Sequence, residues 1–359
     1  MKVFILIFIV TINLYADYNV QNWLLRLRQD LNYGLRPTER SQPLIVKNII
    51  YFGSENGIFY SIRKNDSKII WQKKIKNGIS GNPIFHADNI YFGANNGKFY
   101  CLKADSGEEI WSYYTKYASI ATPSIENAIV YFSAGDNAVY ALDALTGKWL
   151  WQYKRTFPKA LAIRGQSAPT FYKNYIYVGF SDGFLTKLFA LDGKLIWEKK
   201  LNDYHRFIDI DASIYVDDKN LIVSCYDGKL YNLDPSTGKA IWEYDSGGTN
   251  PVVVQNNEVF APTDRGEIIV LNINSGKKIW SFKGERGVIT KPLIHKNMIF
   301  IGTSENKLYA INMKTRQKVW EFSSGSGFST HPLIDEQSNL YFLTNYGNLY
   351  SIKPNNIKL

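Results

Sequence analysis

Tryptophan recurs about once in every forty residues, and this period constrains the fold more than any other feature of the sequence. The spacings are 40, 40, 46, 45, 38 and 40 residues, through Trp71, Trp111, Trp151, Trp197, Trp242, Trp280 and Trp320. A period in this range is typical of repeat architectures, in which each unit buries its apolar face against its neighbours. The length of 359 residues alone would suggest one or two domains, but the repeat favours one array.

Each tryptophan closes the same run of strand and turn signals. In residues 133–151 an apolar run leads through a turn to an alternating run, and Thr146-Gly147 then precedes the tryptophan strand. Asn96-Gly97 and Asp227-Gly228 occupy the first turn of other repeats, as expected of tight hairpins that need positive φ. An apolar strand leads each repeat. These leading strands start at Pro43, Pro83, Pro123, Pro169, Pro251, Pro292 and Pro332, with Ala212-Ser213 in the remaining place.

Four short antiparallel strands per repeat predict the blade of a β-propeller. There are eight leading strands but only seven tryptophan strands in sequence, and residues 23–27, which begin with Trp23, resemble the missing one. We therefore predict an all-β, eight-bladed β-propeller of four-stranded antiparallel blades, whose last blade is closed by the N-terminal strand. Closure removes sheet edges that would invite aggregation. Trp23 and the seven repeated tryptophans are expected to pack between blades.

The N-terminus has the pattern of an export signal. Lys2 precedes an apolar run over residues 3–14, and Ala16 offers a small residue for cleavage. We expect residues 1–16 to be a signal peptide and residues 17–359 to form a single propeller domain. The run is short for a membrane span of about 20 residues, although an uncleaved anchor is the alternative. No cysteine near the junction could accept a lipid, so we expect a periplasmic protein without a lipoprotein anchor.

Composition excludes several classes of site. Two distant cysteines and four scattered histidines offer neither a disulfide framework nor a zinc site, so no metal or cofactor is predicted. The net charge of +10 is spread along the chain without a nucleic-acid-binding motif. We therefore expect no nucleic-acid partner, and membrane lipids or acidic proteins are the natural anionic neighbours.

Two connections between repeats are longer than the rest. From the tryptophan to the next leading strand the distance is 18 residues after Trp151 and 16 after Trp197, against 12 or 9 elsewhere. Both connections leave an outermost strand for the next innermost strand, so they are expected on one face at neighbouring blades. Enlarged loops on a rigid scaffold favour a binding surface.

The residues in these two connections indicate protein recognition. The first holds Leu161, Ile163 and Arg164, and the second holds Asp209 and Asp211. Apolar residues beside an arginine are typical of interface anchors, and the carboxylates could orient the arginine or meet a cation of a partner. An internal ion pair between Arg164 and either aspartate, which merely steadies the loops, is the alternative and is compatible with binding.

The repeat and the two connections carry a family resemblance. The pattern Ala-x-Asp-x-x-Thr-Gly-x-x-x-Trp in residues 141–151 resembles the repeat of quinoprotein-type propellers. The stretch 161–169 and the Asp-x-Asp of residues 209–211 resemble the BamB family of outer-membrane protein assembly factors. The resemblance implies a non-catalytic periplasmic scaffold of the β-barrel assembly machinery that docks on BamA through these loops. It also implies contact with nascent outer-membrane β-barrel proteins, whose strands would pair with blade edges.

Carried over residue by residue, the resemblance assigns partner binding to Leu161, Ile163, Arg164, Asp209 and Asp211, with Ile163 where the family often has leucine. One departure concerns the membrane. Members of the family are usually lipoproteins anchored through an N-terminal cysteine, which this chain lacks near its signal. Attachment to the outer membrane would then come through the partner or through an uncleaved signal.

An enzyme on the same fold is the main alternative. Pyrroloquinoline-quinone dehydrogenases resemble this repeat, but they are longer and carry a Ca²⁺ site, a catalytic aspartate and often a vicinal cysteine pair. Here Cys101 and Cys225 lie three blades apart by repeat count and are expected to be buried free thiols. No nucleophile elbow, phosphate loop or dinucleotide fingerprint appears, so we expect no catalysis. A periplasmic propeller that binds another peptide, glycan or protein is a third possibility.

Overall fold

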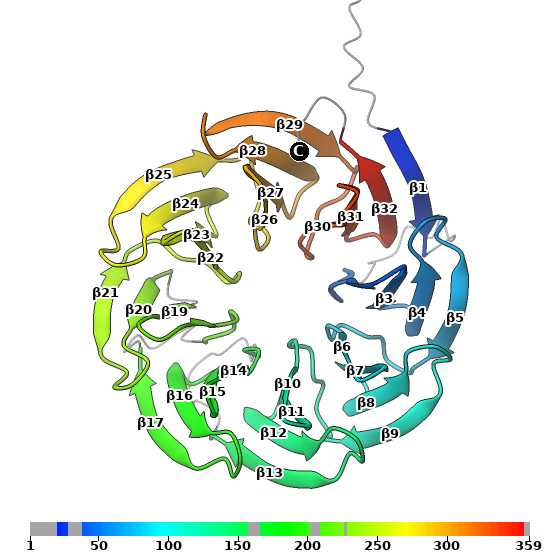
Figure 1. Ribbon diagram of the computed structural model, residues 1–359, viewed down its shortest axis with the longest axis vertical. Coiled ribbons are helices and arrows are strands. Elements are labelled where there is room, and N and C mark those ends of the chain that lie inside the picture. Colours follow the sequence, from blue (N-terminus) through cyan, green and yellow to red (C-terminus); the bar gives the residue numbers. More distant parts are fainter. Residues whose placement is uncertain (1–19, 28–37, 157–165, 202–208, 226–227, 355–359) are drawn as a thin grey trace, which may run out of the picture.

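The computed structural model describes residues 20–27, 38–156, 166–201, 209–225 and 228–354, which form eight four-stranded antiparallel sheets around a central axis (Figure 1). The predicted all-β, eight-bladed propeller is confirmed. Within each blade the first strand lies nearest the axis and the last strand runs along the rim (Figure 1). The described residues include no helix with the length and hydropathy that a membrane crossing requires.

Blades 1 to 4 take their strands in chain order, from the axis outward. Blade 1 contains β2 (Leu44–Val46), β3 (Ile49–Gly53), β4 (Ile58–Arg63) and β5 (Ile69–Lys74). Blade 2 contains β6 (Ile84–His86), β7 (Asn89–Gly93), β8 (Lys98–Lys103) and β9 (Glu109–Tyr114). Blade 3 contains β10 (Ser124–Glu126), β11 (Ile129–Ala134), β12 (Ala138–Asp143) and β13 (Trp149–Lys154). Blade 4 contains β14 (Thr170–Tyr172), β15 (Tyr175–Gly179), β16 (Phe184–Phe189) and β17 (Leu195–Lys200).

Blades 5 to 7 repeat this order, and blade 8 ends with a strand from the N-terminus. Blade 5 contains β18 (Tyr215–Val216), β19 (Leu221–Ser224), β20 (Leu230–Leu233) and β21 (Ala240–Tyr244). Blade 6 contains β22 (Val253–Gln255), β23 (Glu258–Pro262), β24 (Glu267–Asn272) and β25 (Lys278–Lys283). Blade 7 contains β26 (Leu293–His295), β27 (Met298–Gly302), β28 (Lys307–Asn312) and β29 (Gln317–Ser323). Blade 8 contains β30 (Leu333–Ile334), β31 (Leu340–Leu343), β32 (Asn348–Lys353) and β1 (Val20–Arg26).

The N-terminal strand closes the ring, as predicted. β1 pairs antiparallel with β32, with Trp23 opposite Ser351, so the first and last described strands lie side by side in this blade (Figure 1). The Trp23 ring is buried, and its Nε1 donates a hydrogen bond of 2.8 Å to the Lys64 carbonyl of blade 1. The strand therefore completes blade 8 and also joins it to blade 1.

Hydrogen bonds from aromatic residues recur between blades. In blade 1, the Trp71 Nε1 and the Tyr51 hydroxyl both donate to the Ala104 carbonyl of blade 2, at 2.9 Å each. One carbonyl in the turn between the third and fourth strands thus receives two donors from the preceding blade. Three further carbonyls each accept the same pair of hydrogen bonds from a tryptophan and a tyrosine. They are the carbonyls of Ala144 (from Trp111 and Tyr91), Ala190 (from Trp151 and Tyr131) and Pro235 (from Trp197 and Tyr177). We call this arrangement the indole clamp.

The glycine of the same turn explains the repeated Thr-Gly or Ser-Gly. Gly147 has φ +71°, and a Cβ there would lie 2.6 Å from Cδ2 of Trp111. Glycine is needed both for the left-handed backbone and for the close approach of the indole ring. Blade 7 departs from this pattern, because Arg316 takes the position and its guanidinium lies 5.9 Å from the centroid of the Trp280 ring.

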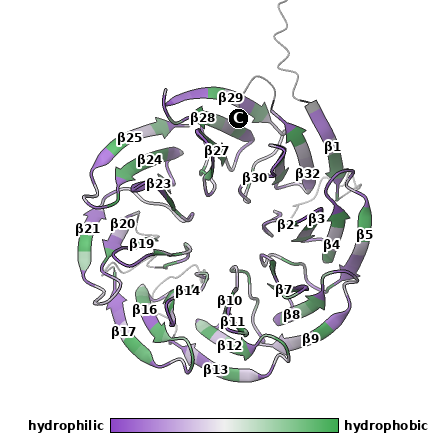
Figure 2. Ribbon diagram, viewed as in Figure 1, coloured by the Kyte–Doolittle hydropathy of each residue, from purple (hydrophilic) through white to green (hydrophobic). Residues whose placement is uncertain are grey.

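The propeller has two distinct faces, which follow from the strand order. The turns between the first and second strands, and between the third and fourth strands, lie on one face, which we call the turn face. The connections between blades lie on the other, which we call the connection face. Figure 2 shows hydrophobic and hydrophilic residues alternating along the outer strands, as expected of sheets with one buried and one solvated side.

We expect Trp23→Ala to lower the free energy of unfolding by about 3 kcal/mol, because it removes a buried indole and the contact that joins blade 8 to blade 1. Urea denaturation followed by circular dichroism measures this change. Trp149→Ala is the control, since the Trp149 side chain is exposed and its loss should change the free energy by less than about 0.5 kcal/mol. Equal losses in both variants would contradict the role of Trp23.

Candidate protein-binding surface

The structure describes part of the predicted binding surface. Leu161, Ile163 and Arg164 lie outside the described residues. Asp209 and Asp211 are described, and they lie on the connection face between blades 4 and 5. The surface is therefore built here from the second connection and from the described ends of the first.

A buried isoleucine fixes the two aspartates. Ile210 is fully buried, and its N–H donates to the Phe180 carbonyl at 3.3 Å. A Cβ on Gly179 would lie 2.2 Å from Cγ2 of Ile210, so a larger residue at position 179 would displace this isoleucine. Ile210 thus anchors the backbone that carries Asp209 and Asp211.

The aspartate pair is unusual in its burial. The Asp209 side chain is fully buried, and Oδ1 of Asp211 is buried without a hydrogen-bond donor among the described residues. Burial raises the pKa of Asp211 to about 7, and the negative charge of Asp209 adds to the effect. A buried acceptor of this kind favours a proton or a cation as its partner.

The described ends of the two long connections contact one another. Ser167 Oγ, at the end of the first, donates to the Ala212 carbonyl of the second at 3.1 Å. The neighbouring Gln166 is tied to the connection between blades 2 and 3, because its Nε2 donates to the Ala118 carbonyl at 2.9 Å and its Oε1 accepts from the Ile120 N–H at 3.0 Å. The described ends of the two connections are therefore hydrogen-bonded to each other, whereas the sequence predicted only that they share a face.

An ion-pair cluster that the sequence reasoning missed stands where the first connection begins. Arg155 Nε donates to Asp182 at 2.6 Å, and Arg155 also pairs with Glu198. Its guanidinium lies 4.0 Å from the centroid of the Phe184 ring. All three partners belong to blade 4, so Arg155 fastens the first connection to the next blade. The sequence could not predict this cluster, because the four residues are far apart along the chain and no local pattern relates them.

Polar side chains form a hydrogen-bonded chain at the start of the innermost strands. The Gln42 N–H donates to Asn82 Oδ1 at 2.7 Å, and Asn82 Nδ2 donates to Thr122 Oγ1 at 2.8 Å. Gln42 also exchanges two hydrogen bonds with the backbone of His331. Burial and the nearby Lys291 lower the pKa of His331 to about 3, so this histidine is neutral near pH 7. Among the described residues, no cluster of three metal-ligating side chains occurs.

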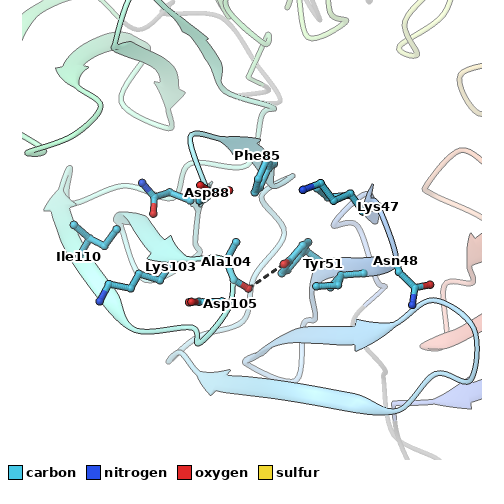
Figure 3. Close-up of a pocket in the computed structure, with 12 residues that line it drawn as sticks. Lys47, Asn48, Tyr51, Phe85, Asp88, Lys103, Ala104, Asp105 and Ile110 are labelled. Atoms are coloured by element: carbon cyan, nitrogen blue, oxygen red, sulfur yellow. Dashed lines mark hydrogen bonds between the residues drawn. The ribbon is translucent and has the colours of Figure 1, made fainter.

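An apolar crevice opens between blades 1 and 2 on the turn face, away from the predicted surface (Figure 3). It has a volume of about 650 Å³, and Tyr51, Phe85 and Ile110 are among its apolar lining residues. Lys47, Lys103, Asp88 and Asp105 also line it, so its formal charges balance. The crevice thus shows no preference for an anion or a cation.

Both cysteines are buried free thiols in the structure. Burial raises the pKa of Cys101 to about 11, so its thiol is protonated near pH 7 and is a poor nucleophile. Cys101 lies in β8 and Cys225 directly follows β19, which places them in blades 2 and 5.

The fold and the repeat together define the class, an eight-bladed propeller with the quinoprotein-type repeat. The chain belongs to the family described as outer membrane protein assembly factor BamB, whose model matches residues 54–231 and 226–358. It is similar to the BamB proteins of Escherichia coli (strain K12), with 25% identity over 128 residues, and of Yersinia pestis, with 28% identity over 128 residues. Each alignment covers 34% of this chain and 33% of the relative, so the chain matches about a third of the length of these curated relatives.

Solved structures share the fold at low sequence identity. The crystal structure of BamB from Moraxella catarrhalis superposes with a TM-score of 0.80 and 20% identity, covering 93% of this chain and 99% of the other. The quinohemoprotein alcohol dehydrogenase of Comamonas testosteroni superposes with a TM-score of 0.77 and 14% identity, covering 94% of this chain and 76% of the other. An assembly factor and an enzyme thus share this scaffold, which leaves function to the sites placed on it.

We expect Asp211→Asn to stabilise the protein more above pH 7 than below pH 4. The folded-state pKa of about 7 exceeds the ordinary value of 3.8, so the folded chain binds more protons than the unfolded chain in this window. The contribution of Asp211 is therefore fully present below pH 3.8 and is lost as the pH rises through 7. Thermal unfolding of the wild type and the variant across this range measures the difference, and parallel curves would contradict the raised pKa.

Proposed function

We propose that this protein is a non-catalytic periplasmic scaffold of the outer-membrane β-barrel assembly machinery, which docks on a BamA-like partner through the connection face of blades 3 to 5. The observation that carries the proposal is the contact between the two enlarged connections through Ser167 and Ala212. It joins Ser167, which follows the segment that contains Arg164 in the sequence, to Ala212, which follows the two aspartates. Membership of the BamB family supports this reading.

The chemistry of the surface suits a charged protein partner. Asp211, which is half-buried, carries a carboxyl group that could pair with a cationic side chain of the partner. Arg164 supplies a guanidinium for a carboxylate, while Leu161 and Ile163 supply apolar contact. Residues 17–359 would act as a single domain after export by residues 1–16, and the partner would hold the protein at the outer membrane.

Nascent barrel proteins are the proposed clients. In the described sheets the outermost strand of every blade pairs on one side only, as β13 and β17 do. Such an edge presents free backbone groups to which an extended segment can add as a further strand. The strands of an unfolded outer-membrane barrel have the required conformation.

The quinoprotein alternative rests on the shared fold, because the dehydrogenase similarity is only 14% in sequence. Titration calorimetry with pyrroloquinoline quinone and Ca²⁺ tests it directly. Saturable binding of the quinone would favour the enzyme over the scaffold.

Charge reversal at Arg164 tests the docking surface. We expect Arg164→Glu to weaken capture of the periplasmic part of a BamA-like partner at least about tenfold, because it replaces the proposed interface arginine with a residue of opposite charge. Quantitative pull-down with purified partner measures the loss.

Arg265→Glu is the matched control. Arg265 is exposed in the turn between β23 and β24, which lies on the connection face at blade 6. This variant should bind as the wild type does. Equal binding by both variants would place the docking surface elsewhere, and a wild type that captures no partner would refute the assignment to the assembly machinery.

A further inference from the structure

Large apolar side chains are exposed at the rim of blades 3 and 4. Leu145 and Leu191, in the turns before β13 and β17, are 70% and 67% exposed, and Trp149 is 49% exposed. Leu150, Leu195 and Ile196 continue the exposed apolar surface along β13 and β17. We call these six residues the rim patch. It lies at the turn face, opposite the proposed docking loops.

The blade architecture does not require leucine in the turns of this patch. At the position of Leu145 and Leu191 the other described turns carry polar residues, namely Asn65, Asp105, Ser236, Asn274 and Lys314. At the position of Trp149, blades 2, 6 and 7 carry Glu109, Lys278 and Lys318. Trp149 is also the one exposed tryptophan of the nine in the chain, all of which are described. Leu150 and Ile196 stand where other blades also carry an exposed apolar residue, such as Ile70, and blade 1 has the exposed Ile69 at the position of Trp149. The turn residues Leu145 and Leu191 are therefore the part of the patch that distinguishes blades 3 and 4 from the other described blades.

The two halves of the patch are joined. Trp151 Nε1 of β13 donates to the Ala190 carbonyl at 2.9 Å, and a Cβ on Gly193 would lie 2.6 Å from the Trp151 ring. The turn that carries Leu191 is therefore seated against the outer strand of blade 3. Leu191 also lines a crevice of about 270 Å³ between the two blades, together with Phe171 and Phe189. An apolar group that covers the patch thus has a cavity to enter.

Exposed lysines interrupt the patch at equivalent places. Lys148 precedes Trp149, and Lys194 precedes Leu195. Neither forms an ion pair among the described residues, and the whole chain carries a net charge of +10. Whatever covers the patch must therefore accept leucine and tryptophan side chains and lysine ammonium groups side by side.

We propose that the rim patch docks on the surface of a lipid bilayer that contains anionic headgroups. Leucine side chains at the tips of two turns enter the acyl boundary, tryptophan sits at the headgroup level, and lysine reaches the phosphates. Each basic residue near an anionic leaflet adds to the attraction. This site goes beyond the proposed function, because it lies on the opposite face from the loops assigned to the protein partner.

Vesicle co-sedimentation of the full chain tests the proposal. We expect binding to vesicles of phosphatidylethanolamine and phosphatidylglycerol, and much weaker binding to phosphatidylcholine alone. The double variant Leu145→Ser/Leu191→Ser should lose about tenfold in affinity, because two leucine side chains no longer leave water. Ile241→Ser/Val319→Ser is the matched control, since both residues are exposed on outer strands of other blades, and it should bind as the wild type does.

The contribution of the lysines to vesicle binding is tested with a second variant and its matched control. Lys148→Glu/Lys194→Glu should weaken binding to the anionic vesicles, whereas Lys239→Glu/Lys277→Glu, at the equivalent turn position of blades 5 and 6, should weaken it less. Equal losses in both variants would show general attraction by net charge and would overturn the assigned site. Quenching of tryptophan fluorescence by brominated lipid should also disappear in Trp149→Phe.

The remaining outcomes distinguish a lipid bilayer from other binding partners of the rim patch. No vesicle binding by the wild type would overturn the proposal, as would equal loss in the serine variants of the patch and of the control. A wild type that forms dimers, which Leu145→Ser/Leu191→Ser dissociates, would identify the patch as an interface between copies. Capture of a BamA-like partner should be unchanged in every patch variant, so failure of this proposal and failure of the docking proposal are distinguishable.

Discussion

The indole clamp is the interaction on which the rest of the structure depends. A blade of four strands cannot bury both of its faces alone, so its stability comes from contact with its two neighbours. In blades 1 to 4, one turn carbonyl of the next blade receives an indole N–H and a tyrosine hydroxyl. Two donors on one acceptor fix both the distance and the rotation between neighbouring blades. Trp23 extends the contact across the point where the ring closes.

In this closed ring the indole clamp and the loops proposed for docking lie on opposite faces. The clamp lies between blades and near the turn face, whereas the connections between blades lie on the opposite face. Two of these connections are longer than the rest, and they stand at neighbouring positions. Ile210 anchors one and Arg155 anchors the other. The surface proposed for docking is thus fastened to rigid blades, as a recognition site on a scaffold should be.

Local signals in the sequence predicted most of the fold. The tryptophan period, the Gly-containing turns and the leading prolines each follow from short-range backbone requirements, and together they fixed the number of blades and the closing strand. Blade 5 lacks its leading proline, and the sequence predicted Ala212-Ser213 in that position. Ser167 donates a hydrogen bond to the Ala212 carbonyl as Ser41 does to the Gly81 carbonyl. Because Pro83 stands two residues after Gly81, the equivalent position in blade 5 is Ile214 and not Ser213.

The candidate site was predicted only in part, because its properties depend on contacts between distant residues. The sequence identified the two long connections, but the burial of Asp211 depends on contacts in space such as the packing of Ile210 against Gly179 of blade 4. The partners of Arg155 come from a turn and two strands of another blade. The central claim is that the two connections bind the partner together. Hydrogen exchange of the backbone amides, with and without the periplasmic part of a BamA-like partner, tests it most directly. Our account predicts protection confined to residues 155–169 and 201–214, and protection on the turn face instead would contradict it.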